Sequence, residues 1–143
     1  MVGDGEDRGK TVHLPRLRGF QRLHLIATEI EQVLLIWQPT FTVVEGYAYT
    51  RNIGSFVTVV EVGTVIRAVL HKLQLDWVTI PPTVLKKWVT GKGNASKDEM
   101  AVRVKEKWGY VSHSDDIVDA YALAQIGQLG EAAVLQLPGA VKG

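Results

Sequence analysis

The stretch Phe41-Thr-Val-Val-Glu45 decides the fold class, because it is a short apolar run that ends in a carboxylate and is followed by Gly46. β-Branched and aromatic residues favour strands, and a glycine commonly bounds them. A second run of this kind, Asp76-Trp-Val-Thr-Ile80, stops at Pro81 and Pro82. We therefore expect two short strands, each buried in a sheet.

In the sequence, one segment with a helical pattern precedes the first strand and another follows it. Apolar residues recur every three or four positions from Phe20 to Trp37, and Pro39 follows, which is typical of an amphipathic helix and its end. Residues 55–73 are rich in valine, which favours a strand. The spacing of their apolar positions and the length of the run favour a helix instead, with Ser55 as its N-cap. We expect a helix there.

The chain after the second strand is also helical in pattern. The expected elements are a helical turn at Val84–Trp88, a loop at Gly91–Gly93, and helices over 95–108 and 114–127, capped by Asn94 and Ser114. Strands that alternate with helices predict an α/β fold, in which helices cover a mostly parallel sheet. Two strands are few for such a sheet, so we expect one to be missing.

The composition is that of an ordinary globular chain, with 46% hydrophobic and 22% charged residues among 143. This length predicts one compact domain. No apolar run approaches the roughly 18 residues that a membrane span needs, and the polar start has no signal-peptide core. The chain has no cysteine, which excludes disulfides, thiolate metal sites and cysteine nucleophiles.

Basic residues gather in the middle of the chain although the net charge is only +1. The lysines of this segment are Lys86, Lys87, Lys92 and Lys97. Closely spaced lysines among glycines suit the backbone of DNA, and a solvated lysine face explains them equally well. The four histidines show no metal-ligand spacing, and the four tryptophans sit in apolar stripes that indicate core positions.

Carboxylates stand at two places where chemistry is expected. Glu45 ends a strand, where ligands of open α/β sheets usually bind, although a solvated strand end explains one such residue better. Asp116 and Asp119 are three positions apart, so a helix places them on one face, where they repel unless a cation or proton lies between them. The helix dipole explains Asp115 and Asp116 as first-turn acids, and it explains Asp119 less well.

In their order along the chain, these segments resemble the RuvC family of Holliday junction resolvases, especially its phage-type members. The resemblance runs from about Arg16 to about Gly127. The segments that carry it are Val44-Glu45-Gly46, Asn52-Ile-Gly-Ser55, Pro82-Thr-Val-Leu-Lys86, Gly91-Lys-Gly-Asn-Ala-Ser-Lys97 and Asp116-Ile-Val-Asp119-Ala120. Each is weak alone, but in the family's order and spacing they are specific when Pro82–Lys86 and Gly91–Lys97 are counted as one lysine segment, so that four pieces match.

The resemblance implies an RNase H-like mixed sheet flanked by helices, and a homodimer that hydrolyses branched DNA by two-metal-ion catalysis. Holliday junctions, forks and flaps are the implied substrates, Mg²⁺ is the implied metal, with Mn²⁺ able to replace it, and the cytoplasm of a bacterial or phage-infected cell is the implied location. The last three of the family's four catalytic carboxylates fall on Glu45, Asp116 and Asp119, with Asp115 as a neighbour that could substitute. The family's DNA lysines fall on Lys86 and Lys97.

One departure concerns the start of the chain. The family opens with a strand of the type Gly-Ile-Asp-Pro-Gly, whose aspartate bridges the metals, whereas Asp4 and Asp7 lie in a polar, glycine-rich stretch. We therefore expect the chain to begin within the second strand of the fold, without the first catalytic aspartate. The expected segments are a polar loop or edge strand over 1–15, a nuclease domain over 16–127, and a flexible tail over 128–143.

Three functions remain open from the sequence. The first is a structure-selective DNA endonuclease. The second is a catalytically silent RNase H-like module for DNA binding or dimerisation, because the first aspartate is not found. The third is an RNase H-like nuclease that acts on RNA, which a direct comparison of RNA and DNA substrates would separate from the first.

Overall fold

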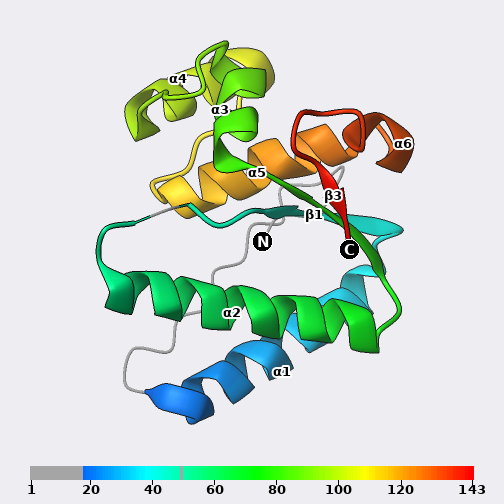
Figure 1. Ribbon diagram of the computed structural model, residues 1–143. Coiled ribbons are helices and arrows are strands. Elements are labelled where there is room, and N and C mark those ends of the chain that lie inside the picture. The colour runs from blue at the N-terminus through cyan, green and yellow to red at the C-terminus, as the bar shows by residue number, and fades with distance from the viewer. Residues whose placement is uncertain (1–17, 49) are drawn as a thin grey trace. The chain divides into compact units, whose positions relative to one another are not determined.

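The computed structural model describes residues 18–48 and 50–143. Its elements are α1 (Gly19–Trp37), β1 (Phe41–Glu45), α2 (Ile53–Lys72), β2 (Asp76–Ile80), α3 (Pro82–Thr90), α4 (Lys97–Trp108), α5 (Asp115–Gly127), α6 (Glu131–Val134) and β3 (Val141–Lys142) (Figure 1). Both predicted strands and the helix over 55–73 are confirmed. The predicted segment 1–15, with Asp4 and Asp7, lies outside the described residues.

The sheet has the strand order β1-β2-β3. The Gly46 N–H, directly after β1, donates to the Ile80 carbonyl at the end of β2 over 2.8 Å, so the two strands finish side by side as parallel neighbours do. β3 is antiparallel to β2, with Val78 opposite Lys142. The sheet is therefore mixed, as the resemblance implied, and it has three strands among the described residues.

The chain forms two compact units. The described part of the first contains Phe41–Gly46 and Trp77–Gly143, and that of the second contains α1, α2 and the residues next to them. In the first unit, α5 packs on β1, and α3, α4 and α6 each contact α5 (Figure 1). Their shared core consists of Val78, Ile80, Leu85, Val89, Met100, Val104, Val118, Ala122, Leu123, Ile126 and Val134.

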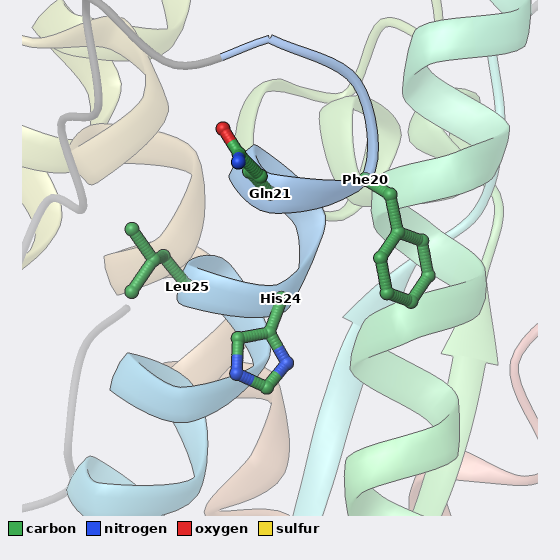
Figure 2. Close-up of a pocket in the computed structure, with 4 residues that line it drawn as sticks. All are labelled: Phe20, Gln21, His24 and Leu25. Carbon is green, nitrogen blue, oxygen red and sulfur yellow. The ribbon is translucent and has the colours of Figure 1, made fainter.

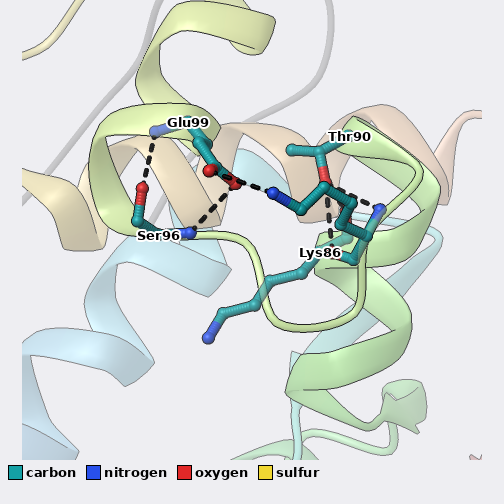
Figure 3. Close-up of polar contacts among 5 residues, drawn as sticks. Lys86, Thr90, Ser96 and Glu99 are labelled. Atoms are coloured by element: carbon teal, nitrogen blue, oxygen red, sulfur yellow. Dashed lines mark hydrogen bonds and ion pairs between the residues drawn. The ribbon is translucent and has the colours of Figure 1, made fainter.

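The cap of α4 differs from the prediction. Asn94 was expected there, but the Ser96 hydroxyl accepts from the Glu99 N–H over 3.1 Å, and the Glu99 carboxylate accepts from the Ser96 N–H over 3.4 Å (Figure 3). This reciprocal capping box needs an acceptor three residues after the cap. Ser96 has Glu99 at that position, whereas Asn94 has Lys97. The helix therefore starts two residues later than expected.

The predicted flexible tail over 128–143 is corrected by the structure. Val134 of α6 is completely buried, and Leu135 and Leu137 pack against the same core. β3 pairs with β2, and the Gly143 N–H donates to the Trp77 carbonyl over 2.9 Å. The physical reason is that the tail covers apolar surface and satisfies backbone groups on the edge of β2.

In the second unit, α1 and α2 pack against each other. Their buried residues include Ile26, Ile30 and Val33 on α1, and Val69 and Leu70 on α2. An ion pair of 2.8 Å between Lys72 and Glu31 also joins the two helices. The predicted amphipathic character of α1 is thus explained by a face that α2 covers.

The Tyr47 side chain packs against α2 at Gly63, where a larger residue would leave no room for it. A Cβ atom on Gly63 would come within 2.5 Å of the Tyr47 ring and hydroxyl. The Arg67 guanidinium lies 4.8 Å from the centre of the same ring and donates to its hydroxyl over 3.0 Å. Gly63 and Arg67 therefore fix the position of Tyr47, which is the second residue after β1.

The length and composition of α2 would allow it to cross a membrane, although the sequence analysis predicted no membrane span. Its mean hydropathy is 1.8, and 17% of it is buried. Ile53 and Val57 are 78% and 46% exposed. Because Glu61 and Arg67 interrupt the apolar residues, the sequence contains no continuous run of that length.

Candidate active site

The predicted carboxylates come from β1 and from the helix that packs on it. Glu45 is the last residue of β1 and is half-buried. The Ser114 hydroxyl caps α5 by accepting from the Ile117 N–H over 3.4 Å, as the sequence predicted. The cap places Asp116 in the first turn of α5, where it is exposed, and Asp119 one turn further, where it is half-buried.

The pKa of Glu45 shows that these carboxylates interact. The pKa is raised from 4.5 to about 7, first by burial and then by repulsion from Asp119 and Asp116, while the Lys86 ammonium opposes the rise. The pKa of Asp119 is raised as well, first by burial and then by Asp116. Both carboxyl groups therefore lie in a partly buried place, where water screens the neighbouring charges incompletely.

Lysines balance part of this negative charge. Lys86 lowers the pKa of Glu45 and that of Asp119, and Lys97 lowers the pKa of Asp119. Lys86 lies one turn into α3, which begins directly beyond the end of β2 and hence near the end of β1. Among the residues that the sequence singled out, Asp116, Asp119 and Lys86 therefore act electrostatically on Glu45, and Asp116, Lys86 and Lys97 act on Asp119.

The other two predicted lysines have different surroundings. The Lys92 ammonium lies 3.1 Å from a carboxylate oxygen of Glu99, within the capping network of α4. Lys87 is exposed and is not among the charges that shift the pKa of Glu45 or Asp119. In Figure 3 the side chain of Lys86 extends away from the capping network, while the Thr90 hydroxyl donates to the Lys86 carbonyl over 2.8 Å.

Sequence reasoning missed how the loop between α3 and α4 is held. Besides its bond to the Lys86 carbonyl, the Thr90 hydroxyl accepts from the Lys92 N–H over 3.1 Å, and Glu99 binds both Lys92 and the backbone of Ser96. The usable signal was Ser96 followed three residues later by Glu99. These contacts fix the start of α4, and with it the position of Lys97.

The donor set fits a hard divalent cation. Mg²⁺ takes oxygen ligands, and a cation would relieve the repulsion that raises the pKa of Glu45 and Asp119. Within residues 18–48 and 50–143, however, no three histidine or carboxylate side chains converge closely enough to form a ligand group. The carboxylates are therefore coupled by their charges but are not arranged as a coordination shell.

A shallow hollow on α1 is a poor alternative site. It is lined by Phe20, Gln21, His24 and Leu25, which all come from the first turns of that helix (Figure 2). The lining contains no carboxylate and only one titratable side chain. We therefore place the candidate active site at Glu45 and the start of α5.

The first unit combines a mixed sheet, a carboxylate at a strand end, two more carboxylates on the covering helix and lysines that act on them. These features define an RNase H-like α/β protein of the nuclease type. The family model for "Crossover junction endodeoxyribonuclease RuvC" matches residues 10–126. The chain belongs to the RuvC family.

Several relatives and solved structures are similar to the chain. The RuvC of Synechococcus sp. strain WH7803 is 30% identical over 109 residues, which cover 75% of this chain and 70% of the relative. The RuvC of Prochlorococcus marinus strain MIT 9303 is 31% identical over 108 residues, with 74% and 70% covered. The structure of T. thermophilus RuvC in complex with a Holliday junction substrate superposes with a TM-score of 0.68 at 21% identity, covering 78% of this chain and 69% of that one.

The raised pKa of Glu45 predicts a pH-dependent stability in the absence of divalent cations. Because the folded state holds the Glu45 proton more tightly than the unfolded state, the free energy of unfolding should fall as pH rises from about 4.5 to about 7. Glu45→Gln should remove this fall and stabilise the protein at pH 8 by about 1–3 kcal/mol, after a discount for partial exposure. Urea unfolding in EDTA, at a series of pH values between 4.5 and 8, measures the free energy of unfolding of both proteins.

Glu61→Gln is the matched control, because Glu61 is an exposed glutamate on α2. This control should keep the pH dependence of the wild type. Parallel stability curves for wild type and Glu45→Gln would show that Glu45 titrates normally.

Proposed function

We propose that the chain hydrolyses phosphodiester bonds of branched DNA, with divalent metal ions held by Glu45, Asp116 and Asp119. The observation that carries the proposal is the mutual electrostatic influence of these three carboxylates and Lys86 at the end of β1. It agrees with membership in a family of crossover junction endodeoxyribonucleases and with the likeness to a structure solved with a Holliday junction substrate. Forks and flaps are further candidate substrates, and the cytoplasm is the proposed location.

The roles of the residues follow from their surroundings. Metal dependence is a property of the family; Mg²⁺ is the proposed ion, with Mn²⁺ able to replace it, and it would stabilise charge on the phosphate and activate water. Glu45 must lose its proton before it can hold a metal, so metal affinity should rise with pH around 7. In this proposal Lys86 would donate to a phosphate oxygen beside the carboxylates, and Lys97 would approach a neighbouring phosphate.

A second candidate is a DNA-binding module that does not cut. It is favoured by one observation, namely that no ligand group of three side chains converges within the described residues. Binding of branched DNA without cleavage, at any Mg²⁺ or Mn²⁺ concentration, would select this candidate. Cleavage of RNA in preference to DNA would select the ribonuclease alternative.

Asp119→Asn should separate metal binding from folding. Because Asp119 is half-buried and subject to the charge of Asp116, its loss should weaken the Mg²⁺-induced rise in melting temperature and lower cleavage of a four-way junction on the order of 100-fold. Melting curves with and without Mg²⁺, and a gel assay of a labelled junction, measure the two effects. Asp98→Asn, an exposed first-turn aspartate of α4, is the control. An unchanged metal response in Asp119→Asn would remove this residue from the site.

Lys86→Ala should reduce junction cleavage more than an alanine change at any other lysine of α3 or α4. Its ammonium is the cation that acts on both Glu45 and Asp119, so its loss should lower the rate at saturating DNA by about tenfold or more. Lys105→Ala, at the exposed end of α4, removes the same charge as a control. Lys87 and Lys92 remain predicted contacts to the DNA backbone. Each such contact should contribute about 0.9 to the slope of the logarithm of the binding constant against the logarithm of the salt concentration. Equal rates for Lys86→Ala and Lys105→Ala would contradict the role of Lys86.

We also propose that two copies of the chain pair through α2. Ile53, Val57 and Val60 recur at four and three positions along the helix, so they share one face, and the first two are 78% and 46% exposed. Glu61 and Arg67 lie within the same helix, and charges within a membrane span are costly. A protein surface therefore fits this face better than lipid, and a second copy offers the same stripe in return.

Val57→Glu should convert the dimer to a monomer, because a twofold interface brings both new carboxylates together. Val102→Glu is the matched control, since Val102 is an exposed valine on α4, at 54%. Sedimentation equilibrium across micromolar concentrations gives the two masses. A dimer that persists in Val57→Glu, or a wild type that stays monomeric, would exclude this interface.

A further inference from the structure

Lys97 and Asp115 form an ion pair beside the candidate active site. The Lys97 ammonium lies 3.5 Å from a carboxylate oxygen of Asp115, and the two side chains are 80% and 52% exposed. Lys97 is the first residue of α4, and Asp115 is the first residue of α5. The contact therefore joins the starts of two helices, and it does so at the residue directly before Asp116.

The position of Lys97 is not explained by the stability of α4. The start of a helix carries a partial positive charge, so a cation there is unfavourable, whereas Asp98 and Glu99 beside it are favourable. The Ser96 capping box and the Lys92–Glu99 pair nevertheless hold Lys97 at this place. Asp115 supplies the compensating negative charge.

Both members of the pair also act on Asp119. Lys97 lowers the pKa of that carboxyl group and Asp115 raises it. Each therefore lies close enough to influence the carboxylate, and they do so with opposite sign. A phosphate that approached Asp116 and Asp119 would meet Lys97 already engaged by a competing carboxylate.

We propose that Asp115 is a positioning residue that holds Lys97 beside the catalytic carboxylates in the free protein and gives it up to a DNA phosphate on binding. The inference rests on the proposed function. It assigns to Asp115 a role different from that of a substitute metal ligand, because Asp115 forms an ion pair with an ammonium group. An exposed pair of this length is weak, so exchange with a phosphate is accessible.

A double-mutant cycle tests the inference. Binding of a fluorescent four-way junction is measured in EDTA at low salt for the wild type, Asp115→Asn, Lys97→Ala and the double variant. Asp115→Asn should tighten binding by about two- to fivefold, because Lys97 no longer has to leave a carboxylate. This gain should shrink as salt screens the pair, and it should disappear in the Lys97→Ala background. Asp115→Glu should restore wild-type affinity.

Asp98→Asn measures the effect of removing any one negative charge at a helix start near the DNA. If Asp115→Asn tightens binding no more than Asp98→Asn, or equally with and without Lys97, the positioning role is overturned while the proposed function stands. If the wild type binds junction no better than linear duplex, the proposed function fails, and the inference fails with it.

Discussion

The packing of α5 on β1 is the contact on which the candidate site depends. It is a contact between apolar surfaces, and Val118, Ala122 and Ile126 of α5 lie in the core. The contact is close, because a Cβ atom added to Gly127 would lie 3.4 Å from the Val43 side chain of β1. The same packing brings the end of β1 to the start of α5. Hydrophobic burial is non-directional, but here it forces acidic groups together in a place where water is partly excluded.

The proximity of the acids has an electrostatic cost, and the surroundings of the site limit it. Lys86 and Lys97 oppose the rise in carboxyl pKa, and part of the charge is removed at neutral pH because Glu45 titrates at about 7. A divalent cation would offset the same repulsion more fully, since it can contact several oxygens at once. Burial, repulsion and two nearby ammonium groups thus make one connected system, in which changing one member alters the protonation of the others.

The loop between α3 and α4 has a comparable role for the cations. Thr90, Ser96 and Glu99 satisfy backbone groups at a helix end and a helix start, where N–H and C=O groups would otherwise lack partners (Figure 3). Because Glu99 also engages Lys92, one lysine of the segment is tied to the loop while its neighbour Lys97 faces α5. Four lysines that look alike in the sequence therefore have different electrostatic partners.

The sequence by itself determined the elements whose signals are local. Apolar periodicity and caps located α1, α2, α5 and both long strands, and the order of the motifs indicated the family. Only the tertiary structure decided the packing of the tail as α6 and β3, and which lysines act on the carboxylates. The reason is physical: a helix cap depends on neighbours three residues away, whereas the pKa of Glu45 depends on burial and charges contributed by β1, α3 and α5 together.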